Sequence, residues 1–369
     1  MDDDALYMRR ALRLARRGWG RVAPNPLVGA VVVRDGAMVG EGWHAEYGGP
    51  HAEVAALRAA GEHARGATAY VTLEPCNHWG RTPPCVDALL AAGVARVVIA
   101  APDPHAIAAG GADRLRVAGV TVDVGVLVEQ ATELNAPFFF DVTGGARPWI
   151  TLKLALSIDA AIADHTRAPA WLTGERSRRV VHRMRAGHDA IAVGIGTALT
   201  DDPQLTARDV PPPRVAPRRV VFDRAARLPL DATLVRTARE QRTCVVCGPD
   251  APTERRDALE SRGVEILAAA SITDACAALR AGGVRSLLVE GGAGIAGALW
   301  RADLVDRLVI FQAPVVLGAG ALPAFGGVPP ERGRGARRIP VLRRRMLGDD
   351  LLTTYAVHPV PTRSAVTSP

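Results

Sequence analysis

Residues 73–85 read LEPCNHWGRTPPC, and residues 49–53, shortly before them, read GPHAE. Within these stretches, His51, Cys76 and Cys85 offer one imidazole and two thiolates, which are ligand types that zinc prefers. Three protein ligands leave the fourth tetrahedral position for water, which is the layout of a catalytic rather than a structural zinc. The two stretches therefore predict one catalytic zinc ion.

Glu53 follows His51 by two residues and is not needed as a ligand. Zinc lowers the pKa of its bound water to about 7, and a nearby carboxylate can carry the proton of that water to departing ammonia. Zinc deaminases carry this pattern as His-x-Glu followed by Pro-Cys-x-x-Cys. Here Pro75 precedes Cys76, but eight residues separate Cys76 from Cys85. The general deaminase signature is thus only partly met.

Strand and helix periodicities alternate around these motifs. In the first part of the chain, the predicted strands are residues 28–33, 37–42, 69–73, 94–100 and 120–124. The predicted helices are residues 5–17, residues 51–60 and a segment that begins near Pro84. Such alternation is typical of an α/β layer fold.

The segment 141–148, DVTGGARP, is the clearest linker signal, and the alternation resumes after it. The later predicted strands are residues 149–156, 190–193, 219–223, 244–247 and 286–290, and the later predicted helices are residues 180–184 and 295–299. We therefore expect two α/β domains, residues 1–146 and 147–369, and a flexible tail at 358–369.

The composition indicates a soluble cytoplasmic protein. The chain has 369 residues, a formal net charge of +7 and five cysteines, an odd number that does not suit a disulfide scaffold. No apolar run approaches the roughly 18 residues of a membrane span, and the acidic start Met1–Asp4 is unlike a signal peptide. Since no long basic run exists either, we expect neither a membrane nor a nucleic-acid partner.

Residues 24–29 (PNPLVG) and 42–44 (GWH), together with the two stretches quoted above, closely resemble the deaminase half of the bifunctional riboflavin-biosynthesis deaminase/reductase family. The wide cysteine spacing is that family's own form. The resemblance implies a cytidine-deaminase-like α/β/α first domain. It also implies hydrolytic deamination of a phosphorylated pyrimidine, 2,5-diamino-6-(5-phosphoribosylamino)pyrimidin-4(3H)-one, at its C2 amine.

The resemblance also implies which residues bind this substrate. Asn25 and His44 would line the pyrimidine pocket, and Asn77, His78 and Arg81 would contact substrate from the loop beside the zinc. The guanidinium of Arg81 suits the ribose phosphate because it can form two parallel hydrogen bonds with it. The family more often has serine at the position of Asn77, which is a mild polar change.

Residues 152–159 (LKLALSID), 196–208 (GTALTDDPQLTAR) and 289–294 (VEGGAG) resemble the reductase half of the same family, a dihydrofolate-reductase-like α/β fold. The Gly-rich turn at 290–294 leads into a predicted helix, whose first backbone N–H groups suit a pyrophosphate. The resemblance implies that NADPH delivers hydride to C1′ of the ribosylamine, which opens the sugar to a ribityl chain.

Lys153 and Glu290 would hold or protonate the pyrimidine in this half. The implied substrate contacts are Lys153, Thr173, Arg185, Asp201, Leu205, Arg208 and Glu290, of which Thr173, Arg185 and Arg208 would hold the phosphate. The implied NADPH contacts are Ala155, Trp171, Thr197, Asp201, Gly291, Gly292, Ala293 and Gly294. Lys153 is also the only lysine among 45 Lys and Arg residues, and its ammonium, unlike a guanidinium, is compact and can lose a proton.

Three departures from the reductase pattern keep a second interpretation open. The family usually has Asp-Gly followed by a basic residue where this chain has Asp159-Ala160-Ala161, and serine where it has Pro169. The chain could therefore be a monofunctional deaminase whose second domain binds a ligand without reducing it. A nucleic-acid base deaminase is a third interpretation, motivated by the charge, but aromatic residues for base stacking make up only 4% of the chain. A homo-oligomer is implied by the resemblance alone.

Some reactive side chains are expected to be structural. Cys244 and Cys247 have the spacing of a redox or zinc pair, but residues three apart in a strand face opposite sides, so we expect core cysteines. Cys276 is also expected in the core. The histidines without ligand spacing are expected to be surface or capping residues: His63, His105, His182, His188 and His358.

Overall fold

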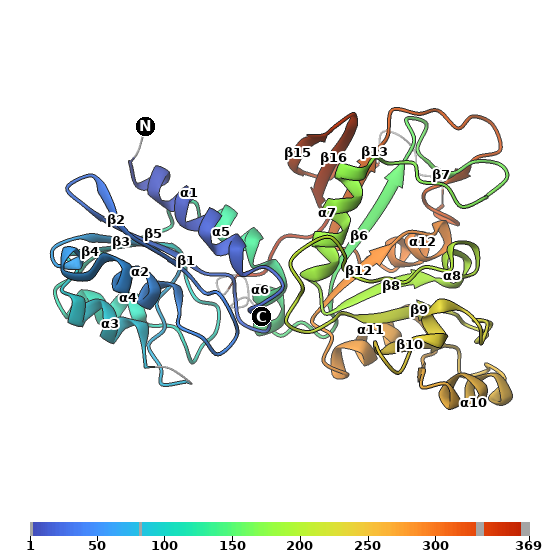
Figure 1. Cartoon of the computed structure of the whole chain (residues 1–369), viewed down its shortest axis with the longest axis horizontal. Coiled ribbons are helices and arrows are strands. Elements are labelled where there is room, and N and C mark those ends of the chain that lie inside the picture. The colour runs from blue at the N-terminus through green and yellow to red at the C-terminus, as the bar shows by residue number, and fades with distance from the viewer. Residues whose placement is uncertain (1–2, 81–82, 330–335, 363–369) are drawn as a thin grey trace. The chain divides into compact units, whose positions relative to one another are not determined.

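The computed structural model describes residues 3–80, 83–329 and 336–362, which separate into two compact units (Figure 1). The first unit runs to Gly145 and includes residues 360–362, and the second runs from Ala146 to Pro359. Of the tail expected at 358–369, residues 363–369 lie outside the described residues. Along the described part of the chain, no helix combines the length and apolarity that crossing a membrane requires.

A five-stranded sheet with the order β2-β1-β3-β4-β5 forms the centre of the first unit. Its strands are β1 (Gly29–Arg34), β2 (Ala37–Trp43), β3 (Thr68–Leu73), β4 (Arg96–Ala101) and β5 (Thr121–Val124). β1 pairs antiparallel with β2 and β3, whereas β3, β4 and β5 run parallel. Asp35 and Gly36 in the β1–β2 turn have φ values of 51° and 77°, as a two-residue hairpin turn requires.

Helices cover both faces of this sheet (Figure 1). The helices α2 (Ala52–Ala60), α3 (Cys85–Ala92) and α4 (Gly111–Val117) pack on one face, and α1 (Asp3–Ala15), α5 (Val128–Leu134) and α6 (Ala136–Val142) pack on the other. Short 3-10 turns at Arg16–Gly18 and Gly61–Ala64 follow α1 and α2. Successive residues of β1 alternate between the two cores, so that Val32 belongs to the α2 side and Val31 to the α1 side. The first unit is therefore the α/β/α domain expected from the sequence.

Close packing of α2 on β2 fixes where that helix begins. A Cβ at Gly42 would lie 2.4 Å from the carbonyl oxygen of Ala52 and equally close to the backbone nitrogen of Ala56. Only glycine permits this approach, because it has no Cβ. The first turn of α2, which follows His51 and contains Glu53, is thereby held against the sheet.

A nine-stranded sheet with the order β11-β10-β9-β8-β12-β6-β13-β16-β15 forms the second unit. Its strands are β6 (Trp149–Leu156), β8 (Ala190–Gly194), β9 (Arg218–Phe222), β10 (Thr243–Cys247), β11 (Glu265–Ala268), β12 (Ser286–Glu290), β13 (Arg307–Gln312), β15 (Val341–Leu347) and β16 (Asp350–Ala356). The strands from β11 to β13 run parallel, and β16 and β15 are antiparallel to their neighbours. β7 (Ala161–Ala163) and β14 (Leu322–Pro323) form a separate pair.

Helices also cover both faces of the larger sheet. The helices α11 (Ile272–Ala281) and α12 (Ala293–Arg301) pack on one face, and α7 (Glu175–Ala186), α8 (Ile195–Asp201), α9 (Thr233–Arg236) and α10 (Thr253–Ser261) pack on the other. Cys244 belongs to the α11 side and Cys247 to the α10 side, and both are buried. Cys276 is buried on α11. The prediction of core cysteines is confirmed.

The buried carboxylate of Asp306 is hydrogen-bonded to residues from both ends of the second unit. Asp306 accepts hydrogen bonds of 2.6 and 2.8 Å from Arg147 and one of 2.8 Å from the backbone of Ile150, and it lies 3.2 Å from His358 Nδ1. Burial alone would raise the pKa of Asp306, but the bonds from Arg147 and His358 hold it below the usual value. In return, the hydrogen bond to Asp306 raises the pKa of His358 against the effect of burial.

β6 and β12 have the predicted bounds, whereas other elements differ from the prediction. The predicted helix 180–184 is the middle of the longer α7, and the predicted linker 141–148 begins inside α6. β13, β15 and β16 lie outside the predicted strands. The sequence of β15, VLRRRML, breaks the apolar pattern of a strand because this edge strand is exposed along most of its length.

Candidate active sites

The three predicted zinc ligands meet in the first unit. The ligand atoms of His51, Cys76 and Cys85 all lie within 4.8 Å of one another. His51 Nδ1 is 3.1 Å from Cys85 Sγ and 3.6 Å from Cys76 Sγ. A tetrahedral zinc with bonds of about 2.0 Å to nitrogen and 2.3 Å to sulfur separates these atoms by about 3.5 Å. The donor set and its spacing therefore fit one zinc ion.

The local fold explains why these distant residues meet. His51 precedes α2 in an extended conformation, Cys76 follows the end of β3, and Cys85 is the first residue of α3. The Cys85 backbone N–H donates to Cys76 Sγ at 3.3 Å. Hydrogen bonds from Cys85 and then from His51 hold the pKa of Cys76 well below its usual range, although burial opposes them. Cys76 is therefore ready to bind a cation as a thiolate.

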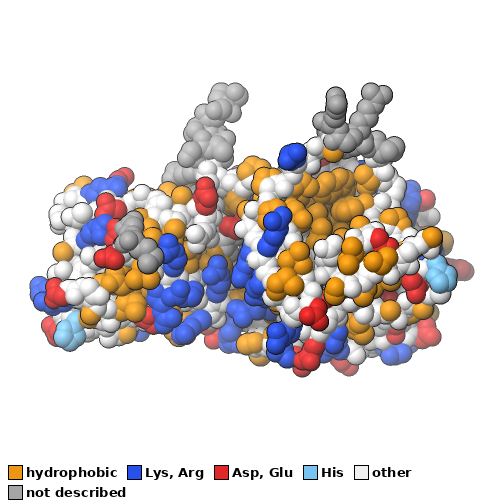
Figure 2. Space-filling model, turned by 90° about the horizontal axis from the view of Figure 1, so that it is seen from above, with side chains coloured by type: hydrophobic (Ala, Val, Ile, Leu, Met, Phe, Trp, Pro, Cys, Tyr) orange, Lys and Arg blue, Asp and Glu red, His pale blue; other side chains and the backbone are white. Residues whose placement is uncertain are grey.

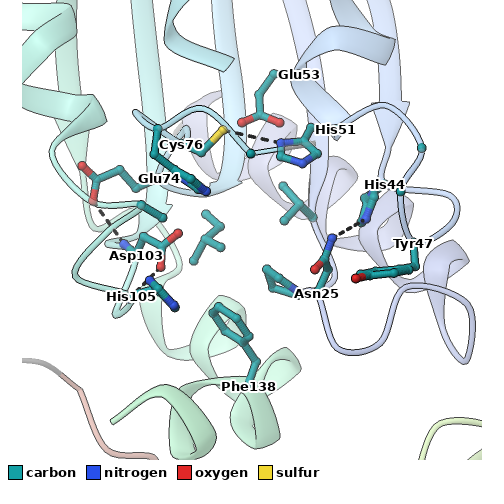
Figure 3. Close-up of a pocket in the computed structure, with 18 residues that line it drawn as sticks. Asn25, His44, Tyr47, His51, Glu53, Glu74, Cys76, Asp103, His105 and Phe138 are labelled. Atoms are coloured by element: carbon teal, nitrogen blue, oxygen red, sulfur yellow. Dashed lines mark hydrogen bonds between the residues drawn. The ribbon is translucent and has the colours of Figure 1, made fainter. Parts of the chain in front are cut away.

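Glu53 lies in the first turn of α2, and its carboxylate reaches the same cavity as His51 and Cys76 (Figure 3). The side chain is 4% exposed. Burial raises the pKa of Glu53 to about 7, with His51 opposing the rise. A carboxyl group of this proton affinity can both accept and donate a proton near neutral pH.

The cluster opens into a cavity of about 310 Å³, which is large enough for a small molecule. Among the residues predicted to form the site, those that line it are Asn25, His44, His51, Glu53, Cys76 and His78. Side chains that line it without having been predicted include Tyr47, Glu74, Asp103, His105 and Phe138 (Figure 3). His105, expected to be a surface or capping residue, is half-buried and accepts from the Ile107 backbone at 3.3 Å, and it also forms part of the cavity wall.

Asn25, His44 and the Pro50 carbonyl form a short chain of hydrogen bonds, which we call the Asn25–His44 relay, and the donor and acceptor of each bond can be assigned. His44 Nδ1 lies 3.1 Å from the carbonyl oxygen of Pro50, and His44 Nε2 lies 3.2 Å from Asn25 Nδ2. A carbonyl oxygen can only accept, so Nδ1 carries the proton and Nε2 accepts from the amide nitrogen. Burial lowers the pKa of His44, which favours this neutral form. The amide oxygen of Asn25 therefore stays available for an N–H group on a ligand.

The opposite wall contains two carboxylates. Glu74 accepts hydrogen bonds of 3.0 to 3.1 Å from the backbone nitrogens of Asp103, Gly110 and Ala112. Asp103 in turn accepts from the backbone of His105 at 2.8 Å. Burial raises the pKa of Asp103 to about 6. Glu74 thus shapes the loop that brings Asp103 and His105 to the cavity.

The three residues predicted in the zinc-side loop have different positions. His78 lines the cavity, and its buried Nδ1 has no hydrogen-bond partner among the described residues. Asn77 is not among the lining residues, and its side-chain oxygen accepts from Arg114 at 2.9 Å. Arg81 lies outside the described residues.

In the second unit, three of the predicted residues form one charged cluster. Arg185 donates to the two carboxylate oxygens of Glu290 at 2.5 and 2.8 Å, and Glu290 pairs in register with Lys153 across β12 and β6. Burial lowers the pKa of Lys153, an effect that Glu290 opposes. Burial would raise the pKa of Glu290, but Arg185 and Lys153 bring it below the usual value. The Arg185 guanidinium is therefore already paired with a carboxylate.

The other predicted substrate contacts are spread around this cluster. Thr173 is buried, and its carbonyl oxygen accepts from Arg178 at 2.8 Å. Arg208 is exposed and donates to the Gln204 side chain at 2.6 Å. Asp201 is exposed at the end of α8, and Leu205 is buried.

The predicted cofactor residues lie where β12, β8 and β6 end or just beyond. Gly291 and Gly292 have φ values of 69° and 82°, and a Cβ at Gly292 would lie 2.9 Å from Thr197 Oγ1. A Cβ at Gly291 or Gly294 would meet open space. The backbone at Gly291 and Gly294 is thus open beside a hydroxyl group, which fits a pyrophosphate, whereas Ala293 between them is buried. Ala155 lies on β6, and Trp171 is 79% exposed with the Arg178 guanidinium 5.3 Å from its ring centre.

Two family models match the chain, one on each unit. A model described as the zinc-binding region of cytidine and deoxycytidylate deaminases matches residues 1–101, and one described as the RibD C-terminal domain matches residues 148–348. The riboflavin biosynthesis protein RibD of Aquifex aeolicus is 43% identical over 320 residues, which cover 86% of this chain and 88% of the relative. The chain belongs to the RibD family.

Other RibD proteins match most of the chain, across both units. RibD of Escherichia coli is 42% identical over 341 residues, covering 86% of this chain and 89% of the relative. The structure of Acinetobacter baumannii RibD has a TM-score of 0.81 at 36% identity, with 96% of this chain and 98% of that chain covered. A Thermotoga maritima deaminase/reductase structure has a TM-score of 0.82 at 34% identity, with the same coverage.

As a member of the RibD family, the chain is a bifunctional enzyme of riboflavin biosynthesis. Its first unit is a zinc-binding deaminase, and its second unit is a reductase that uses NADPH. The interpretation as a monofunctional deaminase is not favoured, since both family models match.

Proposed function

We propose that the deaminase unit hydrolyses the C2 amine of 2,5-diamino-6-(5-phosphoribosylamino)pyrimidin-4(3H)-one and that the reductase unit converts the ribosyl group of the product to a ribityl chain. The Thermotoga relative is named as a diaminohydroxyphosphoribosylaminopyrimidine deaminase and a 5-amino-6-(5-phosphoribosylamino)uracil reductase. The observation that carries the proposal is the His51, Cys76 and Cys85 cluster, which shares one cavity with Glu53.

In the deaminase, Glu53 would be the catalytic residue. Bound zinc supplies an activated water for attack on the ring carbon. Glu53 would take a first proton from the attacking water and give it to the ring nitrogen, and would then carry the second proton, from the new hydroxyl group, to the amine that leaves as ammonia; its pKa of about 7 is suited to both transfers. The Asn25 amide oxygen accepts from an N–H group of the pyrimidine, and His44 keeps the amide in that orientation. The loop with Asn77, His78 and Arg81 binds the phosphorylated end.

In the reductase, buried charge organises the substrate. Bound NADPH supplies the hydride, and the backbone from Gly291 to Gly294 beside Thr197 holds its pyrophosphate. Lys153 and Glu290 hold the pyrimidine, and Lys153 can donate a proton because burial lowers its pKa. Because Glu290 already engages Arg185, we assign the larger part of phosphate binding to the exposed Arg208 and the loop after Trp171. Asp201, Leu205, Thr173 and Ala155 complete the lining.

A coupled assay on one preparation tests both activities. Ammonia release and NADPH oxidation are followed with the diaminopyrimidine phosphate as substrate, and we expect one equivalent of each. Ammonia release without NADPH oxidation at saturating substrate would overturn the reductase assignment. NADPH oxidation that requires the deaminated compound would support the order of the two steps.

We also propose domain limits of 1–146 and 147–369, a homo-oligomer, and a cytoplasmic location. The separation of the described units between Gly145 and Ala146 supports the limit near residue 146, whereas residues 360–362 group with the first unit. Large exposed side chains of the second unit, such as Trp171, and the broad apolar area in Figure 2 support self-association. The five cysteines are unpaired, which suits a reducing compartment. Sedimentation tests the oligomer, and cell fractionation tests the location.

A further inference from the structure

Arg219 on β9 is a buried cation that is bound by neutral oxygens. Its side chain is 1% exposed. The guanidinium donates to Thr237 Oγ1 at 2.7 Å and to the carbonyl oxygens of Thr237, Gln241 and Leu234 at 3.0, 2.8 and 3.2 Å. These oxygens belong to α9 and to the residues just after it. A buried charge carries a desolvation cost, so an arginine at this position needs an explanation beyond filling space.

The same guanidinium reaches the segment 202–208, which we call the 202–208 loop. It lies 3.4 Å from the carbonyl oxygen of Gln204, at the long end for a hydrogen bond. At the other end of α9, the Asp202 carboxylate accepts from the backbone nitrogen and the hydroxyl of Thr233 at 2.7 and 2.6 Å. The loop is therefore tied to α9 twice, through Asp202 at the first residue of the helix and through Arg219 beyond its end.

The backbone at the first tie and directly after the second is strained. Asp202 and Leu205 have φ values of 37° and 50°, a region that residues with a Cβ rarely adopt. Leu205 is buried at 2% exposure among side chains of the α9 side of the sheet. Strained conformations persist only where the surroundings impose them, and they gather at functional sites. The ties at Asp202 and Gln204 are such surroundings.

The residue after Leu205 connects the loop with the reductase site. The carbonyl oxygen of Thr206 accepts from Arg185 at 2.9 Å. Arg185 in turn donates hydrogen bonds to both carboxylate oxygens of Glu290. Glu290 on β12 lies opposite Lys153 on β6 in the sheet register. The position of one loop carbonyl therefore helps to set the position of the charged cluster.

We infer that Arg219 and Asp202 are positioning residues of the reductase: together they hold the 202–208 loop, anchored in the core by Leu205, in the strained conformation that presents Arg208 to the substrate and the Thr206 carbonyl to Arg185. The inference rests on the proposed reductase function. Neither residue touches the charged cluster itself in the structure, so both act through the loop. Lysine cannot replace Arg219, because one ammonium cannot reach oxygens that the guanidinium spans with two nitrogens.

Steady-state kinetics of the full-length Arg219→Lys enzyme test the inference. We expect kcat/KM for the pyrimidine substrate of the reductase to fall about tenfold to a hundredfold, as displaced binding groups typically cause. The fall should include a raised KM for the pyrimidine, while KM for NADPH should change much less, because most of its proposed contacts lie at Gly291–Gly294 and Thr197 and not on the 202–208 loop. Ammonia release by the deaminase unit should keep the wild-type rate. Asp202→Ala, which removes both acceptors for Thr233, should show the same pattern, and the double variant should be much less than additive, because both residues act on one loop.

Arg307→Lys is the matched control. Arg307 is another buried arginine of the same sheet. It donates to the carbonyl oxygen of Asp306, just before β13, and to that of His358, near the C-terminal end of the unit. We expect this variant to lower the melting temperature without changing KM for the pyrimidine. If Arg219 had a purely structural role, Arg219→Lys would behave like Arg307→Lys: a smaller fraction of the enzyme would be folded, and KM for the pyrimidine would be unchanged. That result would overturn the inference. If the wild-type enzyme itself failed to oxidise NADPH, the proposed function would fall instead.

Discussion

Arg185 grips Glu290 through two hydrogen bonds of 2.5 and 2.8 Å, and both side chains are largely buried beside Lys153. The pair balances a carboxylate with a guanidinium, so the ammonium of Lys153 remains as the additional positive charge in the cluster. A buried ammonium loses its proton more readily than an exposed one. Burial thus makes the single lysine of the chain release its proton more readily than an exposed lysine would.

The Lys153→Arg variant should lose reductase activity and keep deaminase activity. A guanidinium is larger than an ammonium and does not release its proton, so we expect NADPH oxidation to fall by about a hundredfold or more, the usual weight of a proton-transfer group. Both activities are measured on the same sample, and ammonia release serves as the folding control. If the variant still oxidised NADPH at the wild-type rate, Lys153 would have no role in the reduction, and its being the only lysine would be a chance result of composition.

Removal of one zinc ligand should release the metal. In Cys85→Ala we expect zinc per chain, measured by atomic absorption, to drop far below one and ammonia release to be abolished, because only two protein ligands remain. Cys276→Ala removes a buried core thiol of the reductase unit and should keep both zinc and deamination. Full metal and activity in Cys85→Ala would refute the ligand assignment.

The Asn25–His44 relay predicts different effects for two replacements of His44. Asparagine can still donate to the Pro50 carbonyl but cannot reach Asn25, so the amide is free to rotate. We expect His44→Asn to raise the deaminase KM about tenfold, the usual effect of one lost hydrogen bond. Glutamine reaches the Asn25 amide and should raise KM less. Equal effects of the two variants would show that the orientation of Asn25 does not matter.

Ala160→Gly should stabilise the reductase unit. Ala160 has a φ of 61°, a left-handed conformation that glycine adopts without strain. We expect a gain of about 0.5 to 1 kcal/mol in the free energy of unfolding, measured by urea denaturation of the full chain. Ala163→Gly on β7 is the control, and it should destabilise because glycine weakens a strand. A loss of stability in Ala160→Gly would mean that the turn does not strain its alanine.

The stabilising effect of His358 should be greater in acid than in alkali. Hydrogen bonds to Asp306 and Asp303 raise the pKa of His358 above its ordinary value of about 6.5 in the folded protein. Such a group stabilises the fold fully below its unfolded pKa, and this contribution disappears as the pH rises through the folded pKa. The unfolding free energy of wild type minus that of His358→Gln should therefore be larger at pH 5.5 than at pH 9. A larger difference at pH 9 would contradict the raised pKa.

The zinc site could be predicted from sequence because short motifs fix it. The ligands stand at the starts of two helices and after one strand, and the order of these elements is visible in the apolar pattern. Tyr47 and Phe138 could not be predicted, since only the packing of distant segments brings them to the cavity. The position of Asp103 beside the cavity could have been predicted from the sequence. It follows β4, the parallel neighbour of β3, and the carboxyl ends of parallel neighbours meet at one edge of the sheet.

The reductase site was less accessible to sequence reasoning. The motif around Asp201 and Arg208 marks the right loop, but a pattern does not tell which residues bind substrate and which hold the backbone. Asp202 is adjacent to Asp201 and yet binds Thr233 of α9. The pairing of Arg185 with Glu290 joins residues 105 positions apart, and only the sheet order reveals it.

Asp306 binds Arg147, the second residue of the reductase unit, and His358, its last residue but one. The chain therefore enters and leaves this unit at one carboxylate. A module with neighbouring ends can be cut out, inserted into a host protein or circularly permuted with little distortion. A short junction is therefore enough to join the reductase unit to another domain, which makes residues 146–359 a practical cassette for building other two-enzyme chains.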